Sequence, residues 1–180
     1  MRYAVLLRGI NVGGKNKVDM GELKTHTSEL GYENVATYIN SGNLFFDSED
    51  KTSTIKKKME KLFEENYPFI KAFSLISKEE YERDYEKLPS WWREDLARKD
   101  VLFYRDKVDK NLLEDAIKRL EMTENEVVAF GEIAVYWGKY DEADFLKTAY
   151  HKQLLKMPFY KEITIRNGKT FEKIGEFLKR

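Results

Sequence analysis

A glycine-rich stretch near the beginning of the chain has the residue spacing of a phosphate-binding loop. It reads L-R-G-I-N-V-G-G-K-N-K, from Leu7 to Lys17. Gly9, Gly14 and Lys15 fit the first seven positions of the pattern G-x-x-x-x-G-K-S/T, in which backbone N–H groups and the lysine bind phosphates. The eighth position is Asn16, which has no hydroxyl to bind Mg²⁺. The match therefore lacks the Mg²⁺ ligand that a nucleoside triphosphatase needs.

The helix expected after this stretch begins too late for such a loop. In a phosphate loop the lysine opens the helix, so that N–H groups and the helix dipole converge on the phosphates. Here Asp19 and Glu22 have the spacing of a capped helix start, and this start lies four residues beyond Lys15. We therefore reject the triphosphatase interpretation.

Two interpretations of the glycine-rich loop stay open. In the first, the loop binds another anion, because Arg8, Lys15 and Lys17 supply positive charge and the glycines let backbone amides approach a ligand. In the second, it is only a strand-to-helix turn that needs a positive φ angle at Gly13 and Gly14, and its lysines are solvated.

The hydrophobic pattern around the loop predicts the element order β-α-β-β-α-β in the first half of the chain. Strands are expected at Tyr3–Leu7, Val35–Ile39, Leu44–Phe46 and Ile70–Ile76, with helices between Asp19 and Gly31 and along Ile55, Met59, Leu62 and Phe63. In a split βαβ unit the third strand lies antiparallel beside the first. The glycine-rich loop and the polar turn Asn40–Asn43 should therefore meet at one edge of the sheet.

The same element order recurs after a break at Leu88–Lys99. Strands are expected at Val101–Tyr104, Glu126–Phe130, Ile133–Trp137 and Ile163–Ile165, and helices along Leu112–Leu120, Asp141–Leu155 and Phe171–Leu178. We therefore expect an α+β fold of two tandem βαββαβ units, each a ferredoxin-like split βαβ arrangement with an antiparallel or mixed sheet. The units should span residues 1–88 and 100–180, with a connecting segment at 89–99. Because the halves share no residue-level repeat, a single mixed α+β domain is the alternative.

Composition excludes several classes of function. The 180 residues include 32 basic and 32 acidic side chains, so no overall field attracts nucleic acid or an anionic membrane. The absence of cysteine excludes disulfides, thiolate nucleophiles and cysteine-bound metals. No apolar run approaches the roughly 20 residues that span a bilayer. We expect a cytoplasmic protein that does not associate with membranes and has no cofactor; the oligomeric state is left undetermined.

The sequence contains no recognisable catalytic constellation. His26 and His151 stand near neither a glycine-framed serine nor a metal-ligand spacing, and we interpret both as surface or helix residues. Asp141, Glu142 and Asp144 could ligate a metal, but their place before an expected helix is better explained by the helix dipole. No metal site is predicted, and whether the protein is an enzyme stays undecided.

Aromatic residues raise the alternative of an RNA-binding module. RNA-recognition domains have this strand order and expose aromatic side chains on the open sheet face, where Tyr3, Tyr38 and Phe45 could lie. The third strand, N-L-F-F-D, lacks the basic-Gly-aromatic signature, so packing is the preferred interpretation and nucleic acid is not the expected partner. Trp91 and Trp92 should likewise pack the two halves together, although with Arg93 they could line a ligand groove.

Three segments resemble the motifs of a bacterial family catalogued as domain of unknown function 1697. They are Tyr3–Met20, Thr37–Phe46 (T-Y-I-N-S-G-N-L-F-F) and Thr164–Thr170 (T-I-R-N-G-K-T). The resemblance implies an α+β fold with two subdomains and no established activity. The shared positions are Arg8, Gly9, Asn11, Gly13, Gly14, Ser41, Gly42, Asn43, Arg166, Asn167 and Thr170. The chain departs at Gly168, where the family pattern usually has tryptophan, so an aromatic face for stacking a planar ligand is missing there.

These observations lead us to expect a small anionic ligand, a nucleotide or a phosphorylated metabolite, bound at the edge formed by the glycine-rich loop and the polar turn. The predicted ligand-binding residues are Arg8, Asn11, Gly13, Gly14, Lys15, Lys17, Asn40, Ser41, Asn43, Arg166 and Asn167. Two alternatives stay open. One is a protein-interaction or assembly module in which the glycine-rich loop is purely structural, and the other is a weak RNA-binding module.

Overall fold

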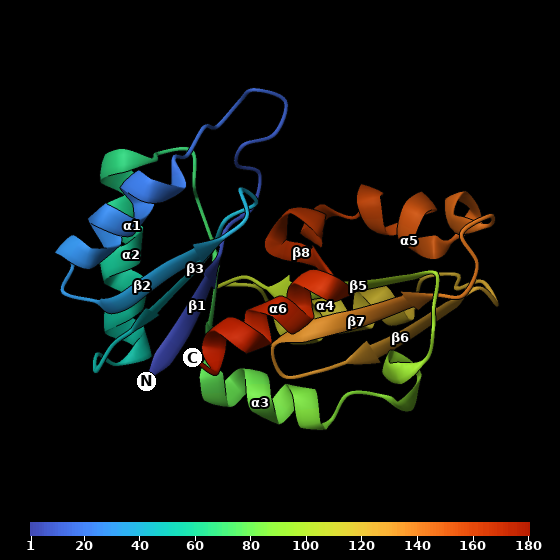
Figure 1. The fold of residues 1–180 in the computed structure, drawn as a ribbon. Helices are drawn as coiled ribbons and strands as arrows, with labels where there is room; N and C mark the ends of the chain where they lie inside the picture. Colours follow the sequence, from blue (N-terminus) through green and yellow to red (C-terminus); the bar gives the residue numbers. More distant parts are fainter. The chain divides into compact units, whose positions relative to one another are not determined.

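The computed structural model describes residues 1–180, which divide into two compact units. The first unit comprises Met1–Glu79 and Ile174–Arg180, and the second comprises Glu80–Lys173. Each contains a four-stranded antiparallel sheet (Figure 1). Residues 80–88 therefore belong to the second unit and residues 174–180 to the first, the reverse of the expected division.

The first unit has the predicted order β-α-β-β-α-β. Its elements are β1 (Arg2–Leu6), α1 (Met20–Glu29), β2 (Glu33–Tyr38), β3 (Asn43–Asp47), α2 (Thr52–Asn66) and β4 (Ser74–Ser77). The strands lie in the order β2-β3-β1-β4, and all neighbours are antiparallel. The third strand therefore pairs with the first, which confirms the predicted ferredoxin-like arrangement.

A local signal sets the start of α1, whereas β4 begins later than expected. The Asp19 carboxylate caps α1 by accepting the N–H groups of Gly21 at 2.7 Å and Glu22 at 3.0 Å, as the sequence predicts. The strand expected at Ile70–Ile76 is wrong in its first part, since β4 begins only at Ser74. Ile70 instead donates its N–H to the carbonyl of Tyr67 in a turn. Its side chain is buried in the core, which explains the apolar character of this segment.

Both faces of the first sheet are covered. Tyr3 packs in the core that β1 forms with α1 and α2, whereas the fully buried Phe45 stacks on Phe177 with ring centroids 4.7 Å apart. Tyr38, which is partly buried, lies 5.6 Å from the same ring. The packing preferred from the sequence is therefore confirmed for Tyr3 and Phe45. The helices cover the face that carries Tyr3, and the last residues of the chain cover the face that carries Phe45, which an RNA-recognition domain leaves open.

The second unit repeats the same topology. It begins with most of α3 (Lys78–Glu86), followed by β5 (Arg98–Tyr104), α4 (Lys110–Lys118), β6 (Glu126–Phe130), β7 (Ala134–Lys139), α5 (Ala149–Lys152), β8 (Ile163–Asn167) and the first half of α6 (Gly168–Leu178). The strand order is β6-β7-β5-β8, which corresponds strand for strand to the first sheet. The prediction of two tandem units of one topology is confirmed.

The single helix predicted over Asp141–Leu155 is wrong. The segment contains the four-residue α5, with 3₁₀ turns at Phe145–Lys147 and Leu154–Lys156. Thr148 is extended and caps α5 with its hydroxyl, while the Glu126 carboxylate accepts the N–H groups of Ala149 at 2.8 Å and Tyr150 at 2.9 Å. These side-chain oxygens replace the carbonyls that a continuous helix would supply. None of the helices in the structure has the length and apolar character to cross a membrane.

Candidate functional site

The glycine-rich loop of the first unit is a small hairpin. Lys15 donates its N–H to the carbonyl of Val12 at 3.1 Å, and Asn11 donates its own to the carbonyl of Asn16 at 3.0 Å. The two residues at the tip, Gly13 and Gly14, have φ angles of 58° and 72°. Two-residue hairpin turns of type I′ require positive φ at both positions, which explains these glycines without a ligand.

Asn11 joins this loop to the neighbouring polar turn. Its side-chain oxygen accepts the N–H of Val18 at 2.9 Å, and its amide nitrogen donates to the carbonyls of Val18 and Asn40, both at 3.0 Å. At the same edge, Leu7 donates its N–H to the carbonyl of Gly42 at 2.8 Å. The structure therefore brings the loop and the turn together, as the sequence predicts. The Asn11 side chain holds them in place through protein contacts.

The remaining predicted ligand residues divide between the two units. Lys15 and Lys17 are exposed on the hairpin, and Ser41 is exposed on the turn. Asn43 is fully buried and donates its side-chain amide to the carbonyl of Tyr38 at 2.9 Å. Arg8 is partly exposed and has contacts within the protein. Arg166 and Asn167 belong to the second unit, where Asn167 faces a different cavity.

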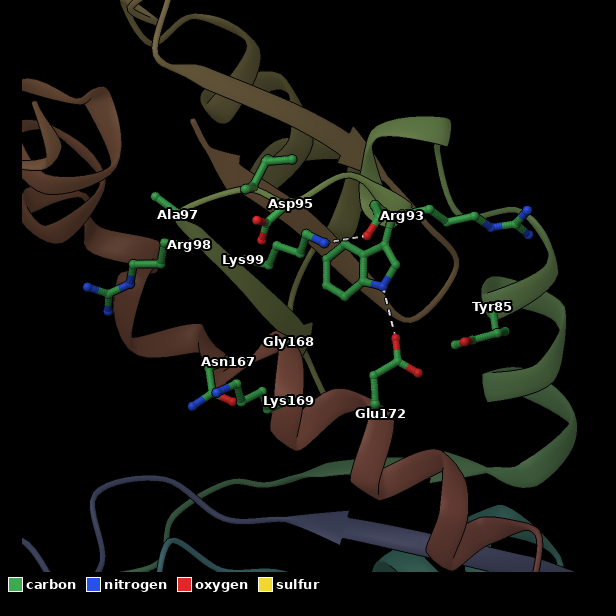
Figure 2. A pocket seen from close by; sticks show the side chains of 12 residues that line it. Tyr85, Arg93, Asp95, Ala97, Arg98, Lys99, Asn167, Gly168, Lys169 and Glu172 are labelled. Carbon is green, nitrogen blue, oxygen red and sulfur yellow. Dashed lines mark hydrogen bonds between the residues drawn. The ribbon is translucent and has the colours of Figure 1, made fainter. Parts of the chain in front are cut away.

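This cavity is a groove of about 590 Å³ that lies entirely within the second unit (Figure 2). Its walls come from the end of α3, from the 3₁₀ helix Ser90–Arg93 and the segment after it, from the start of β5 and from the first turns of α6. The groove thus lies beside the segment expected to connect the two units.

Cationic side chains outnumber acidic ones around the groove. Its charged residues are Arg93, Arg98, Lys99 and Lys169 against Asp95 and Glu172. Lys99 is already bound within the protein, because its ammonium donates to the carbonyls of Trp92 and Glu94, both at 2.5 Å. The exposed Arg93 and Lys169 make no side-chain hydrogen bond or ion pair. They are available to an anionic ligand.

A buried network holds Arg98 at the groove. Its Nε donates to Asp100 Oδ2 at 3.2 Å, and its guanidinium carbon lies 4.6 Å from the centroid of the Phe145 ring. Asp100 also accepts a hydrogen bond from the ammonium of Lys139 at 2.5 Å, and both of these side chains are buried. The two terminal nitrogens of the half-exposed Arg98 have no hydrogen-bond partner. The guanidinium is therefore held at one nitrogen and open at two.

The burial of the Lys139 ammonium in this network has an electrostatic cost. Burial lowers its pKa from 10.5 to about 8, even though the neighbouring Asp100 carboxylate favours the charged form. The ammonium lies 3.4 Å from the centroid of the Tyr150 ring. An aromatic face and one carboxylate thus replace water around this cation.

The start of α6 forms the opposite wall. The Asn167 side-chain oxygen caps the helix by accepting the N–H of Thr170 at 2.8 Å. The next residue, Gly168, would place a Cβ atom only 3.1 Å from that of Lys99. A side chain at this position would project beside Lys99, so the glycine that departs from the family pattern leaves the groove open. The first turn of a helix also carries partial positive charge.

The two tryptophans pack within the second unit. Trp92 donates its indole N–H to Glu172 Oε1 at 3.0 Å, and its ring lies edge-on to Tyr136 and Phe171, each at 5.5 Å. Trp91 is also buried and lies against Gly138. These contacts lie inside one unit and do not join the two halves as expected. Trp92 also lines the groove, which was the alternative expected from the sequence.

Sequence reasoning missed much of this groove. It singled out Trp92, Arg93 and Asn167. It omitted Arg98, because it placed the beginning of β5 at Val101, and it also omitted Lys169 and Glu172 on α6. The spacing of Arg98 and Asp100 could have indicated an earlier start of β5 and a contact between the two side chains, because residues two apart share one face of a strand.

The other chemically interesting residues are accounted for by local structure. His26 lies on α1, with Nδ1 3.3 Å from the Glu29 carboxylate, and His151 lies on α5 with its ring 5.3 Å from that of Phe145. Both histidines are therefore helix residues, as predicted. No group of three or more histidine, cysteine, aspartate or glutamate side chains in the structure could hold a metal ion.

Comparison with known proteins identifies relatives without a described activity. The chain is similar to a solved structure described as that of the conserved bacterial protein SP0830 from Streptococcus pneumoniae, with 53% identity, coverage of 98% of both chains and a TM-score of 0.96. No curated protein matches. Residues 1–136 match the family described as "Protein of unknown function (DUF1697)". The resemblance noted in the sequence is thereby confirmed, and the chain belongs to this family.

Proposed function

We propose that the protein binds a small anionic ligand, a nucleotide or another phosphorylated metabolite, in the groove of the second unit. One observation carries this proposal: a cavity of about 590 Å³ is lined by three cationic side chains with unused donors, namely Arg93, Arg98 and Lys169. Small-molecule sites typically enclose about 300–1,000 Å³. The groove therefore has both the size and the charge for such a ligand.

The geometry favours phosphate over a cationic or neutral ligand. Arginine presents its donors in a planar fork that matches two phosphate oxygens, and the fork of Arg98 is held at Nε with its remaining nitrogens open. The partial positive charge at the start of α6 adds to the field of Lys169. Asp95 and Glu172 lower the net charge without cancelling it.

Isothermal titration of the purified protein with nucleotides and sugar phosphates tests this function. Arg98→Ala should weaken binding by roughly 1.5–3 kcal/mol, about 10- to 150-fold, which is the range for hydrogen bonds to charged groups. Arg119→Ala is the matched control, because Arg119 is an exposed arginine of the same unit outside the groove. Binding that Arg98→Ala leaves unchanged, or no binding at millimolar concentration, would contradict the proposal.

The glycine-rich edge of the first unit is the second candidate for anion binding. It is favoured by the bonds of Asn11 that unite the loop and the turn beneath the exposed Lys15 and Lys17. Lys15→Ala and Lys17→Ala in the same titration distinguish this edge from the groove. Loss of binding in these variants alone would move the site to the first unit.

An assembly module is the third candidate, and exposed apolar residues at the same edge favour it. Val12 and Ile39 have 69% and 48% of their surface exposed. Ile39 also has a φ angle of 48°, a strained conformation for a β-branched residue. Sedimentation of the wild type and of Ile39→Asn over a range of concentrations tests this candidate. A mass that increases with concentration for the wild type but not for the variant would support it.

The cytoplasmic location expected from the sequence stays a prediction.

A further inference from the structure

We infer that the glycine-rich edge of the first unit binds an acidic segment of a partner protein, one in which apolar side chains stand beside carboxylates. The edge consists of the hairpin at residues 7–17 and the turn at residues 39–43, which lie at the same end of the first sheet (Figure 1). Binding of such a partner is independent of any ligand in the groove of the second unit.

Ile39 has neither a favourable backbone conformation nor a buried side chain. Its φ angle of 48° lies in the left-handed region, where a β-branched side chain crowds the backbone. Asparagine and glycine adopt this region at lower cost. The side chain also keeps 48% of its surface exposed, so burial within the chain does not offset the strain. Residues strained in this way cluster at binding sites, and a partner that covers Ile39 supplies the missing burial.

Val12 adds a second exposed apolar side chain to the same edge. It keeps 69% of its surface exposed beside the glycines of the hairpin tip. The side-chain amide of Asn11 donates to the carbonyl of Asn40 at 3.0 Å, which joins the residue before Val12 to the residue after Ile39. The two apolar side chains therefore belong to one connected surface. Its hydrogen-bonded backbone limits the entropy that is lost on binding.

The charge of this edge favours an acidic partner. Neither the hairpin nor the turn contains an acidic residue, whereas Lys15 and Lys17 are exposed and make no ion pair within the chain. Val12 and Lys15 face each other in an antiparallel bridge, so their side chains are neighbours on one face of the hairpin. A partner with an apolar residue beside a carboxylate matches this pair in both polarity and charge.

A membrane and a nucleic acid match the edge less well. Basic segments that bind anionic lipids carry about four to eight lysines and arginines, and the edge has only three basic residues. Proteins that bind single-stranded nucleic acid stack the bases on exposed aromatic rings. The aromatic residue beside the turn, Tyr38, is instead partly buried and lies 5.6 Å from the ring of Phe177.

Fluorescence anisotropy with labelled peptides tests this partner. The probe is a pool of peptides with the pattern Asp-Glu-Φ-Asp-Φ-Glu-Asp, in which Φ is Leu, Ile, Val or Phe. One control pool has Ser at Φ, and the other has Lys in place of every acidic residue. We expect the probe to bind more tightly than both control pools and to lose affinity as the salt concentration rises.

Substitutions locate the binding surface. Ile39→Asn and Lys15→Glu should each weaken binding of the probe at least about fivefold, because one removes an apolar contact and the other reverses a charge. Leu112→Asn and Lys24→Glu are the matched controls, since they change an exposed leucine and an exposed lysine outside the edge. Neither control should alter the affinity.

The stability of Ile39→Asn provides an independent readout. Because asparagine tolerates a positive φ angle better than isoleucine does, the variant should be at least as stable as the wild type in thermal unfolding. A variant that keeps its stability and loses binding shows that Ile39 serves a contact with a partner. A clear loss of stability would show that Ile39 serves the fold, and it would overturn the inference.

Four other outcomes also overturn it. The acidic partner is wrong if the probe does not bind at millimolar concentration, and the site is wrong if binding survives both substitutions at the edge. Self-association of the wild type that Ile39→Asn abolishes would make a second copy of the chain the partner. Binding to vesicles of phosphatidylserine and phosphatidylcholine that Ile39→Asn abolishes would make the edge a membrane site. None of these results changes the titrations that test the groove.

Discussion

The buried ammonium of Lys139 should make the stability of the protein rise with pH in the alkaline range. Its pKa is about 8 in the folded protein, against 10.5 for an ordinary lysine, because burial disfavours the charged form. Between these two pH values the unfolded chain binds more protons at this residue than the folded protein does. The free energy of unfolding therefore increases with pH, by at most about 1.4 kcal/mol per pH unit.

The size of this effect follows from the same pKa difference. The lowering of the pKa from 10.5 to about 8 corresponds to a gain on the order of 3 kcal/mol when the pH is raised through this interval. Urea unfolding of the wild type and of Lys139→Met at pH 7, 8, 9 and 10 measures it. We expect the wild type to gain stability relative to the variant above pH 8. In the variant, Asp100 keeps the Nε of Arg98 as a donor.

Nuclear magnetic resonance provides the direct check. The ¹³Cε signal of Lys139, assigned by its loss in Lys139→Met, should titrate near pH 8, well below the ordinary value for a lysine side chain. A Lys139 signal that titrates at or above the ordinary value would refute the reasoning. It would mean that the ion pair with Asp100 outweighs the cost of burial.

Two further predictions concern the first unit. Arg2→Met should destabilise the protein by roughly 2 kcal/mol in urea unfolding. The buried guanidinium donates to the carbonyl of Phe177 at 2.6 Å and to the Asp47 carboxylate at 3.1 Å, and the variant loses both bonds. A variant as stable as the wild type would show that water replaces these bonds. Gly42→Ala should cost more stability than Gly13→Ala. Both glycines have positive φ, worth roughly 1–2 kcal/mol each, but only at Gly42 would a Cβ collide with Leu7, at 2.7 Å; equal melting temperatures of the two variants would contradict this difference.

The predictable part of the fold rests on short-range signals. The cap at Asp19, the turn at Asn40–Asn43 and the strand at Glu126–Phe130 each depend on neighbouring residues, and the structure has all three. The errors occur where distant residues intervene. The Glu126 carboxylate binds the backbone at Ala149 and Tyr150 and so interrupts the expected helix there. Sequence spacing cannot reveal such a bond.

The candidate site was predictable only in part for the same reason. The meeting of the glycine-rich loop with the polar turn follows from strand order, because β3 must lie beside β1 in this topology. No such rule of strand order predicts the groove. Its wall combines the segment around Arg98 with the start of α6, and nothing in either stretch indicates the other.

By itself, the sequence determined the order of elements, the tandem topology and the glycine requirement of the hairpin tip, because periodicity and backbone conformation act over a few residues. Only the tertiary structure decided which cations are available. It bound Lys99 to two carbonyls and fixed Arg98 through Asp100 while leaving its terminal nitrogens open. Whether a charged side chain meets a ligand or the protein depends on what packs around it, and that is a property of the folded chain alone.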